Sequence, residues 1–216
     1  MFHVEHEQEL RKLLVRSSQE IGVTLTDNQV ALFMCYLSQL TRWNETINLT
    51  SITRPQDIVV KHFVDSLTGI VKAVLSPHAR LVDVGTGGGF PGIPIKIARD
   101  DLKLVLVEPN KKKCSFLLSV LGVLCFTDAE VFNGTVQEYC HESQGIMDVA
   151  TVRAVKFEGI QDSILALLKE KGKVILYRTS TLAQTELGKN WNLVSQGLFS
   201  LPLQSGKRVI SVLEKG

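Results

Sequence analysis

The sequence predicts an α/β protein, in which a helical segment precedes a doubly wound, largely parallel sheet with an antiparallel last strand. Apolar residues follow helical spacing up to about residue 75, and beyond it they form short strand-like runs that alternate with helical segments. This alternation predicts a parallel sheet with helices on both faces. The last two runs are separated only by residues 201–206, which are too few for a helical crossover, so we expect an antiparallel pair.

Helix signals recur through the first third of the chain. Apolar residues between positions 10 and 21 repeat at i, i+3 and i+4. Thr26 and Gln29 have the spacing of a capping box, which predicts a helix start, and Pro55 suits the first turn of a later helix that runs toward residue 74. We therefore expect a helical extension and an α/β domain, over residues 1–75 and 76–216.

Strand and helix patterns alternate through the rest of the chain. Strands are predicted at residues 81–84, 102–107, 129–132, 147–152, 173–177, 191–199 and 207–213. Helices are predicted between them at residues 93–99, 111–121, 158–170 and 181–188. Ligands of such sheets bind beyond the carboxyl ends of the strands, so that edge is where a site is expected.

Composition excludes several classes of protein. The amino terminus carries acidic and histidine residues in place of the basic and apolar parts of an export signal, so we expect a cytoplasmic protein. Charged residues interrupt every apolar run, so no membrane span is expected. The four cysteines form no C-x-x-C pair, which predicts buried free thiols and no metal site. The net charge of +2 is too small to predict nucleic-acid binding by itself. Any such binding would depend on local clusters of positive charge such as Lys111–Lys113.

A glycine-rich turn directly after the first predicted strand is the most informative stretch. Residues 82–92 read Val-Asp-Val-Gly-Thr-Gly-Gly-Gly-Phe-Pro-Gly, a pattern that lets a ligand approach the backbone closely. Read literally, Gly87-x-Gly89-x-x-Gly92 is also a dinucleotide fingerprint, and Glu108 follows at the offset of a carboxylate that holds ribose hydroxyls. A nucleotide-like cofactor is therefore expected at this turn.

Electrostatics distinguishes two candidate cofactors, a dinucleotide such as NAD(P) and S-adenosylmethionine. A carboxylate beside the turn, supplied by Asp83, would repel a pyrophosphate and attract the cationic methionyl part of S-adenosylmethionine. The first glycine of a dinucleotide fingerprint also follows its strand at once, whereas Gly87 comes two residues after Gly85. S-adenosylmethionine is favoured, and two other readings stay open: an NAD(P)-dependent oxidoreductase and a non-catalytic RNA-binding module.

Four segments carry a resemblance to a known family. Residues 83–94 resemble the D-V-G-T-G-x-G-x-P-G-I-P motif of the ribosomal RNA small subunit methyltransferase G family, also called glucose-inhibited division protein B. Trp43–Thr50 is similar to the family's W-N-x-x-x-N-L-T, His62–Ser66 to its H-x-x-D-S, and Arg153–Ala154 to its R-A after the fourth strand. The resemblance spans roughly residues 36–216.

The resemblance implies a class I, Rossmann-like methyltransferase that uses S-adenosylmethionine, releases S-adenosylhomocysteine and methylates N7 of a guanine in 16S ribosomal RNA, free or in a small-subunit precursor. It implies that Gly85 and Phe90 contact the cofactor, that Val136 and Gln137 flank the adenine, and that Arg153 lies at the methionine end. With the residues found above, the expected cofactor site comprises Asp83, Gly85, Gly87, Phe90, Glu108, Val136, Gln137 and Arg153.

No catalytic residue is expected, because guanine N7 carries an in-plane lone pair and loses no proton on methylation. The sequence departs from the family pattern at Pro109 and at Arg178, which stands where a Lys-Gly pair is usual. The sequence leaves open whether His62 and Asp65 position RNA or tie the helical part to the sheet. Lys111–Lys113 either bind phosphate or form a solvated face.

Overall fold

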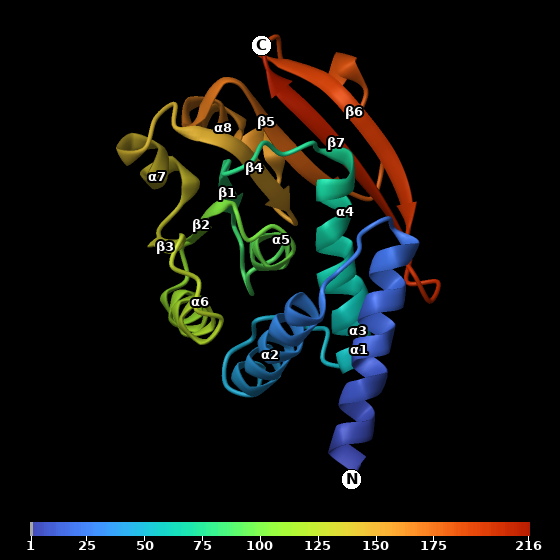
Figure 1. Cartoon of the computed structure of the whole chain (residues 1–216). Helices are drawn as coiled ribbons and strands as arrows, with labels where there is room; N and C mark the ends of the chain where they lie inside the picture. The colour runs from blue at the N-terminus through green and yellow to red at the C-terminus, as the bar shows by residue number, and fades with distance from the viewer. Residues whose placement is uncertain (1) are drawn as a thin grey trace.

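A seven-stranded sheet forms the centre of the molecule, in the order β3-β2-β1-β4-β5-β7-β6. The structure is a computed structural model that describes residues 2–216 (Figure 1). The strands are β1 Arg80–Val84, β2 Lys103–Glu108, β3 Ala129–Asn133, β4 Met147–Arg153, β5 Leu168–Arg178, β6 Trp191–Ser200 and β7 Lys207–Lys215. Neighbours among β1 to β5 run parallel, whereas β7 is antiparallel to β5 and β6. The predicted doubly wound sheet with its terminal hairpin is confirmed.

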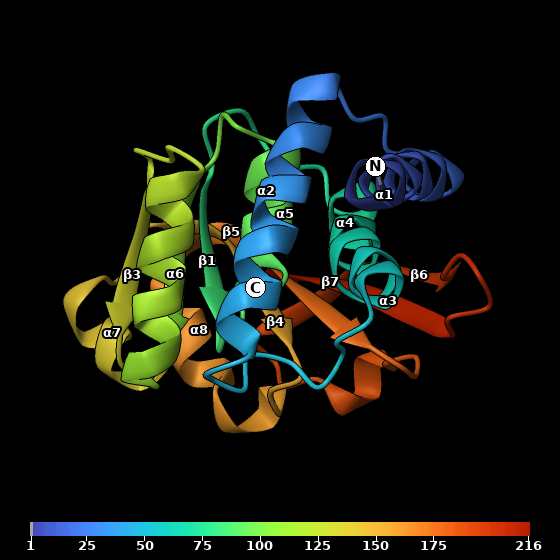
Figure 2. The same ribbon diagram turned by 90° about the horizontal axis from the view of Figure 1, so that it is seen from below.

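Helices cover both faces of this sheet (Figures 1 and 2). They are α1 Phe2–Glu20, α2 Asp27–Asn44, α3 Pro55–Ile58, the π-helical segment η1 Val59–Val64, α4 Asp65–Lys72, α5 Gly92–Ala98, α6 Lys111–Val123, α7 Val136–Glu142 and α8 Gln161–Leu167. The chain also has two short 3-10 turns, η2 Phe157–Gly159 before α8 and η3 Gln184–Glu186 before β6. The capping box predicted at Thr26 and Gln29 is present at the start of α2.

Alternate residues along each strand face two different hydrophobic cores, as the period of a strand requires. Leu81 and Leu104 belong to a core shared with α1, α2, α4, α5 and α6, whereas Val82 and Val105 belong to a core under α7 and α8. The helices of the first 75 residues thus share a core with one face of the sheet. The division of the chain near residue 75 stays a prediction.

Two predicted helical segments differ from the structure. The helix expected at 158–170 covers only Gln161–Leu167, because β5 already begins at Leu168, where it pairs with Met147 of β4. The segment 181–188 forms only the turn η3, where the Gln184 side chain binds the Trp191 carbonyl and the Leu193 amide of β6. Tertiary pairing overrides helix propensity at both places.

Helix α7 was not predicted, although the sequence carries a signal for it. Thr135 and Glu138 form a second capping box at its start. The helix is only seven residues long, too short to show the apolar period by which the other helices were identified. The expectation that the cysteines are buried is also wrong for Cys125, which is exposed, whereas Cys114 and Cys140 are buried.

The parallel register brings the carboxyl ends of four strands to one edge. Val84, which ends β1, is level with Val107 of β2 and Val152 of β4. Glu108 is level with Asn133 at the end of β3. The residues that follow these strands therefore lie along the edge where ligands of such sheets bind. Among the residues that the structure describes, no helix has the length and apolarity that a bilayer crossing needs.

Candidate functional site

The turn after β1 combines left-handed backbone with open space. Gly85 and Gly87 have φ angles of +67° and +58°, which side chains on L residues rarely adopt. A Cβ at Gly85 would lie 2.7 Å from Cγ2 of Val155, whereas a Cβ at Gly87 would meet nothing within 4 Å. Gly87 is thus the point at which a ligand can approach the turn, and Gly85 is needed for packing within the protein.

Asp83 organises this turn from the inside. Its side chain is 0 % exposed, and Oδ2 accepts hydrogen bonds from the Thr86 hydroxyl and from the Gly92 amide at 2.8 Å. Oδ1 accepts from the hydroxyl of Thr151 at 2.7 Å. Burial raises the pKa of the Asp83 carboxyl, and these hydrogen bonds oppose the rise. The carboxylate therefore holds the turn and the start of α5 from inside the protein. Its contact with a ligand stays a prediction.

Glu108 holds the turn from the end of β2. One carboxylate oxygen accepts from the Gly87 amide at 2.9 Å, and the other accepts from the Asn110 amide at 2.9 Å. The side chain is 5 % exposed. A carboxylate has about four lone-pair positions, so two remain for ligand hydroxyls. The expected contact with ribose is compatible with this geometry and stays a prediction.

Phe90 and His62 form a stacked pair that joins the turn to the helical segment. Their ring centroids lie 4.3 Å apart with an interplanar angle of 14°. The guanidinium carbon of Arg153 lies 5.9 Å from the centroid of Phe90. The structure thus brings two expected site residues, Phe90 and Arg153, together with a histidine whose role the sequence left open.

Hydrogen bonds fix the orientation of Arg153. Its Nη2 donates to the Lys61 carbonyl at 3.0 Å and to Nδ1 of His62 at 2.9 Å, and it lies 3.5 Å from Oδ2 of Asp65. Its Nη1 is buried and finds no hydrogen-bond partner among the described residues. A buried, unpaired donor is costly, so Nη1 is the group in this cluster that a ligand would satisfy.

His62 is neutral and has a defined tautomer. Since arginine only donates, Nδ1 of His62 must accept, which leaves the proton on Nε2 to be donated to Oγ1 of Thr50 at 2.7 Å. Burial, and next the positive charge of Arg153, lower the pKa of His62 to about 3. A chain of hydrogen bonds therefore runs from Thr50 in the helical extension to Arg153 at the sheet.

Asp65 pairs with a residue that the sequence analysis did not select. Arg208 of β7 donates from Nε to Oδ1 of Asp65 at 2.7 Å and from Nη2 to Oδ2 at 2.8 Å. Two buried tyrosines add further ties: the Tyr36 hydroxyl donates to the Gly88 carbonyl in the turn, and the Tyr177 hydroxyl donates to the Ser66 carbonyl. His62 and Asp65 thus tie the helical segment to the sheet, which is one of the two roles left open.

Val136 and Gln137 follow β3 at the same edge but differ in exposure. The side chain of Val136 is buried in the core under α7, so only its backbone can meet a ligand. Gln137 is exposed, and its Nε2 donates to the Gly159 carbonyl at 3.3 Å. Asn133 joins this segment to β2, since its Nδ2 donates to the Glu108 carbonyl at 3.1 Å. Their contact with adenine stays a prediction.

The first turn of α6, which carries three lysines, is capped by a side chain of the same segment. Oδ1 of Asn110 accepts from the amides of Lys112 and Lys113 at 3.0 and 3.2 Å, which satisfies first-turn donors. Lys111 and Lys112 are exposed and Lys113 is half-buried. Phosphate binding by these lysines stays a prediction.

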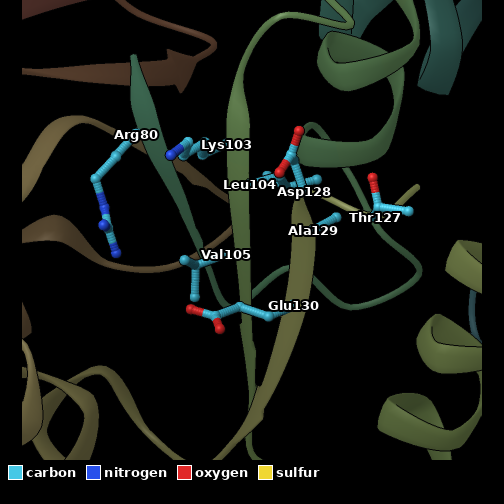
Figure 3. A pocket seen from close by; sticks show the side chains of 8 residues that line it. All are labelled: Arg80, Lys103, Leu104, Val105, Thr127, Asp128, Ala129 and Glu130. Carbon is cyan, nitrogen blue, oxygen red and sulfur yellow. The ribbon is translucent and has the colours of Figure 1, made fainter. Parts of the chain in front are cut away.

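A separate pocket lies at the opposite edge of the sheet. Figure 3 shows Arg80 of β1, Lys103 of β2 and Glu130 of β3 around it, each at or near the start of its strand. Parallel strands place their starts away from the glycine turn, so this pocket is not part of the site. Within residues 2–216, no group of three or more His, Cys, Asp or Glu is arranged to hold a metal ion.

Gly87→Leu is expected to weaken cofactor binding at least about tenfold, or about 1.4 kcal/mol, because the new side chain fills the open space above the turn. The matched control is Gly145→Leu, since Gly145 has a φ of +62°, also faces open space and precedes β4 at the opposite edge. Calorimetric titration with S-adenosylhomocysteine measures the affinity of both. Equal affinities of the two variants would show that no ligand approaches Gly87.

Comparison with known proteins agrees with this geometry. A family model described as rRNA small subunit methyltransferase G matches residues 29–209. Proteins named ribosomal RNA small subunit methyltransferase G are similar to this chain: one from Geotalea uraniireducens is 35% identical over 95% of this chain and 96% of its own length, and one from Desulfitobacterium hafniense is 32% identical over 98% and 90%. One from Caldanaerobacter subterraneus is 39% identical over 67% of this chain and 61% of its own length.

Solved structures share the fold at low sequence identity. TrmN from Thermus thermophilus has a TM-score of 0.58 at 16% identity and covers 71% of this chain and 49% of its own. TYW2 from P. horikoshii has a TM-score of 0.53 at 12% identity, with 89% and 64% covered. These likenesses show the class I methyltransferase fold alone. The family model over residues 29–209 and the relatives matched over nearly their full length establish that this chain belongs to the rRNA small subunit methyltransferase G family.

Proposed function

We propose that the protein transfers the methyl group of S-adenosylmethionine to N7 of a guanine in small-subunit ribosomal RNA. The observation that carries the proposal is the turn at Gly87, which faces open space and is held by Glu108, in a member of this methyltransferase family. The RNA is the 16S species, free or within a small-subunit precursor, and the reaction takes place in the cytoplasm.

The donor would lie along the carboxyl edge of β1 to β4. Glu108 would bind the ribose hydroxyls with its free lone pairs, and the segment at Val136 and Gln137 would flank the adenine. Gly85 and Phe90 would contact the cofactor from the turn, and Arg153 would lie at the methionine end. When bound, S-adenosylmethionine supplies an electrophilic methyl group on a sulfonium centre.

The buried titratable groups suit a reaction that needs no base. Both oxygens of Asp83 accept hydrogen bonds inside the protein, and both ring nitrogens of His62 are engaged by Arg153 and Thr50. Neither group is placed to take a proton from a substrate. Methylation of N7 removes none, so the residues would act by holding donor and acceptor in line, which can supply several kcal/mol of barrier reduction.

Ligand-induced stabilisation tests the proposal. S-adenosylmethionine and S-adenosylhomocysteine should raise the melting temperature, whereas NAD and NADP should not. At a ligand concentration a hundred times Kd, the free energy of unfolding should rise by about 2.7 kcal/mol. Incubation with methyl-labelled donor and small-subunit RNA, followed by mapping of modified bases, should locate one N7-methylguanine. Stabilisation by the dinucleotides alone, or label confined to other atoms, would overturn the proposal.

A further inference from the structure

A cavity of about 440 Å³ opens beside the glycine turn, at the carboxyl ends of β4 and β5. It is lined by residues 153–155, residues 177–180 and Arg208. Val155 is the residue whose Cγ2 lies against Gly85, and Arg153 reaches to 5.9 Å from the Phe90 ring. The cavity therefore adjoins the expected donor site. Of the expected donor residues, Arg153 lines the cavity, whereas Glu108 and Val136 do not.

The lining carries an excess of positive charge. Arg153, Arg178 and Arg208 all line the cavity, and no acidic residue does. Asp65, behind them, is a single carboxylate shared between Arg208 and Arg153. The guanidinium of Arg178 donates from Nε to the Ser180 carbonyl over a long 3.4 Å and pairs with no carboxylate among the residues that the structure describes. Three cations against one anion leave the cavity suited to an anionic, acceptor-rich ligand.

Arg153, which lines this cavity, has one donor that lacks a partner. Nη2 of Arg153 is engaged by Lys61, His62 and Asp65, whereas Nη1 is buried and unpaired among the described residues. Because His62 accepts through Nδ1 and is itself held by Thr50, the plane of the guanidinium is fixed. A fixed guanidinium nitrogen can only donate, so it selects a ligand that offers an acceptor.

Resting on the proposed function, we infer that this cavity holds the acceptor nucleotide, with guanine O6 accepting from Nη1 of Arg153 and the nucleotide phosphate at Arg178 and Arg208. Guanine carries O6 and N7 as neighbouring acceptors on one edge, so a donor at O6 leaves the N7 lone pair free for the methyl group. Adenine places an amino group at the position of O6, where donor would face donor. Arg153 is thus the residue that selects guanine.

Binding of mononucleotides tests the cavity without RNA. With S-adenosylhomocysteine present, NMR titration should show guanosine monophosphate binding about tenfold more tightly than adenosine monophosphate, the discrimination expected of one well-placed base contact. Arg178→Ala should weaken both nucleotides alike, because it removes a phosphate contact. Arg153→Lys should abolish the preference for guanine. Arg16→Ala, which removes an exposed arginine on α1, is the charge-matched control and should change neither.

The same variants are then compared in single-turnover methylation of small-subunit RNA. Arg178→Ala should raise the RNA concentration for half-maximal rate several-fold while donor affinity stays that of the wild type. Equal nucleotide binding by Arg178→Ala and Arg16→Ala, or a preference for guanine that survives Arg153→Lys, overturns the inference. Failure of the wild-type protein to methylate RNA overturns the proposed function instead, and the mononucleotide titrations still decide whether the cavity binds guanine nucleotides.

Discussion

Asp83→Leu is expected to lower the free energy of unfolding by about 3 to 5 kcal/mol and to abolish binding of S-adenosylhomocysteine. The leucine leaves the Gly92 amide and the Thr86 hydroxyl without their acceptor, and it leaves the Thr151 hydroxyl only the Val82 carbonyl, 3.5 Å away. Each buried donor left unpaired costs about 1 to 3 kcal/mol. Loss of these bonds also releases the turn that presents Gly87. Urea unfolding and calorimetric titration measure the two effects.

Asp83→Asn is the matched control, because it keeps the volume and one acceptor oxygen. In one orientation its oxygen still accepts from Thr86 and Gly92, while its amino group donates to the hydroxyl of Thr151, which can rotate to accept. We therefore expect a loss of about 1 kcal/mol and a measurable donor affinity. If Asp83→Leu unfolded and bound like Asp83→Asn, the buried hydrogen bonds would not be what shapes the turn.

His62 is expected to make the protein markedly less stable in mild acid. Its pKa is about 3 in the folded protein against 6.5 for the free side chain, so between these values only the unfolded chain takes up the proton. The histidine's contribution to stability is complete above pH 6.5 and falls by about 1.4 kcal/mol for each pH unit below it, until the folded form also titrates near pH 3.

The measurement is the free energy of unfolding in urea at pH 7.0 and 4.5 for the wild type and for His62→Gln. The variant does not titrate, so its loss of stability over this range should be smaller than that of the wild type by about 2.5 kcal/mol. His141→Gln, which alters an exposed histidine on α7, should keep the wild-type dependence. An unchanged dependence in His62→Gln would mean that the buried ring is protonated in the folded protein.

Much of the fold could be predicted because it depends on local patterns. The strand-like runs, the capping box at Thr26 and the short connection at 201–206 each act within a few residues, and the structure confirms the sheet, the start of α2 and the terminal hairpin. The errors at 158–170 and 181–188 occur where β5 and β6 impose pairing on segments of ambiguous propensity.

Some residues of the candidate site could also be predicted from local sequence patterns, and others could not. The glycine turn and the residues that end the strands could be placed from the sequence, since parallel strands end at a common edge. Arg208 and Tyr36 could not, because Arg208 lies 143 residues from Asp65 and Tyr36 lies 52 residues from Gly88. No pattern of short range connects residues so far apart in the chain.

The sequence by itself therefore determined the sheet, the position of the turn and the family to which the chain belongs, because hydrophobic period, glycine and a long contiguous motif are properties of neighbouring residues. Only the tertiary structure decided which way the side chains point. It turned Asp83 inward, left Gly87 and not Gly85 facing open space, and left one nitrogen of Arg153 unpaired. Those outcomes depend on which strands and helices become neighbours, since packing and hydrogen bonding are settled between elements that are distant in sequence.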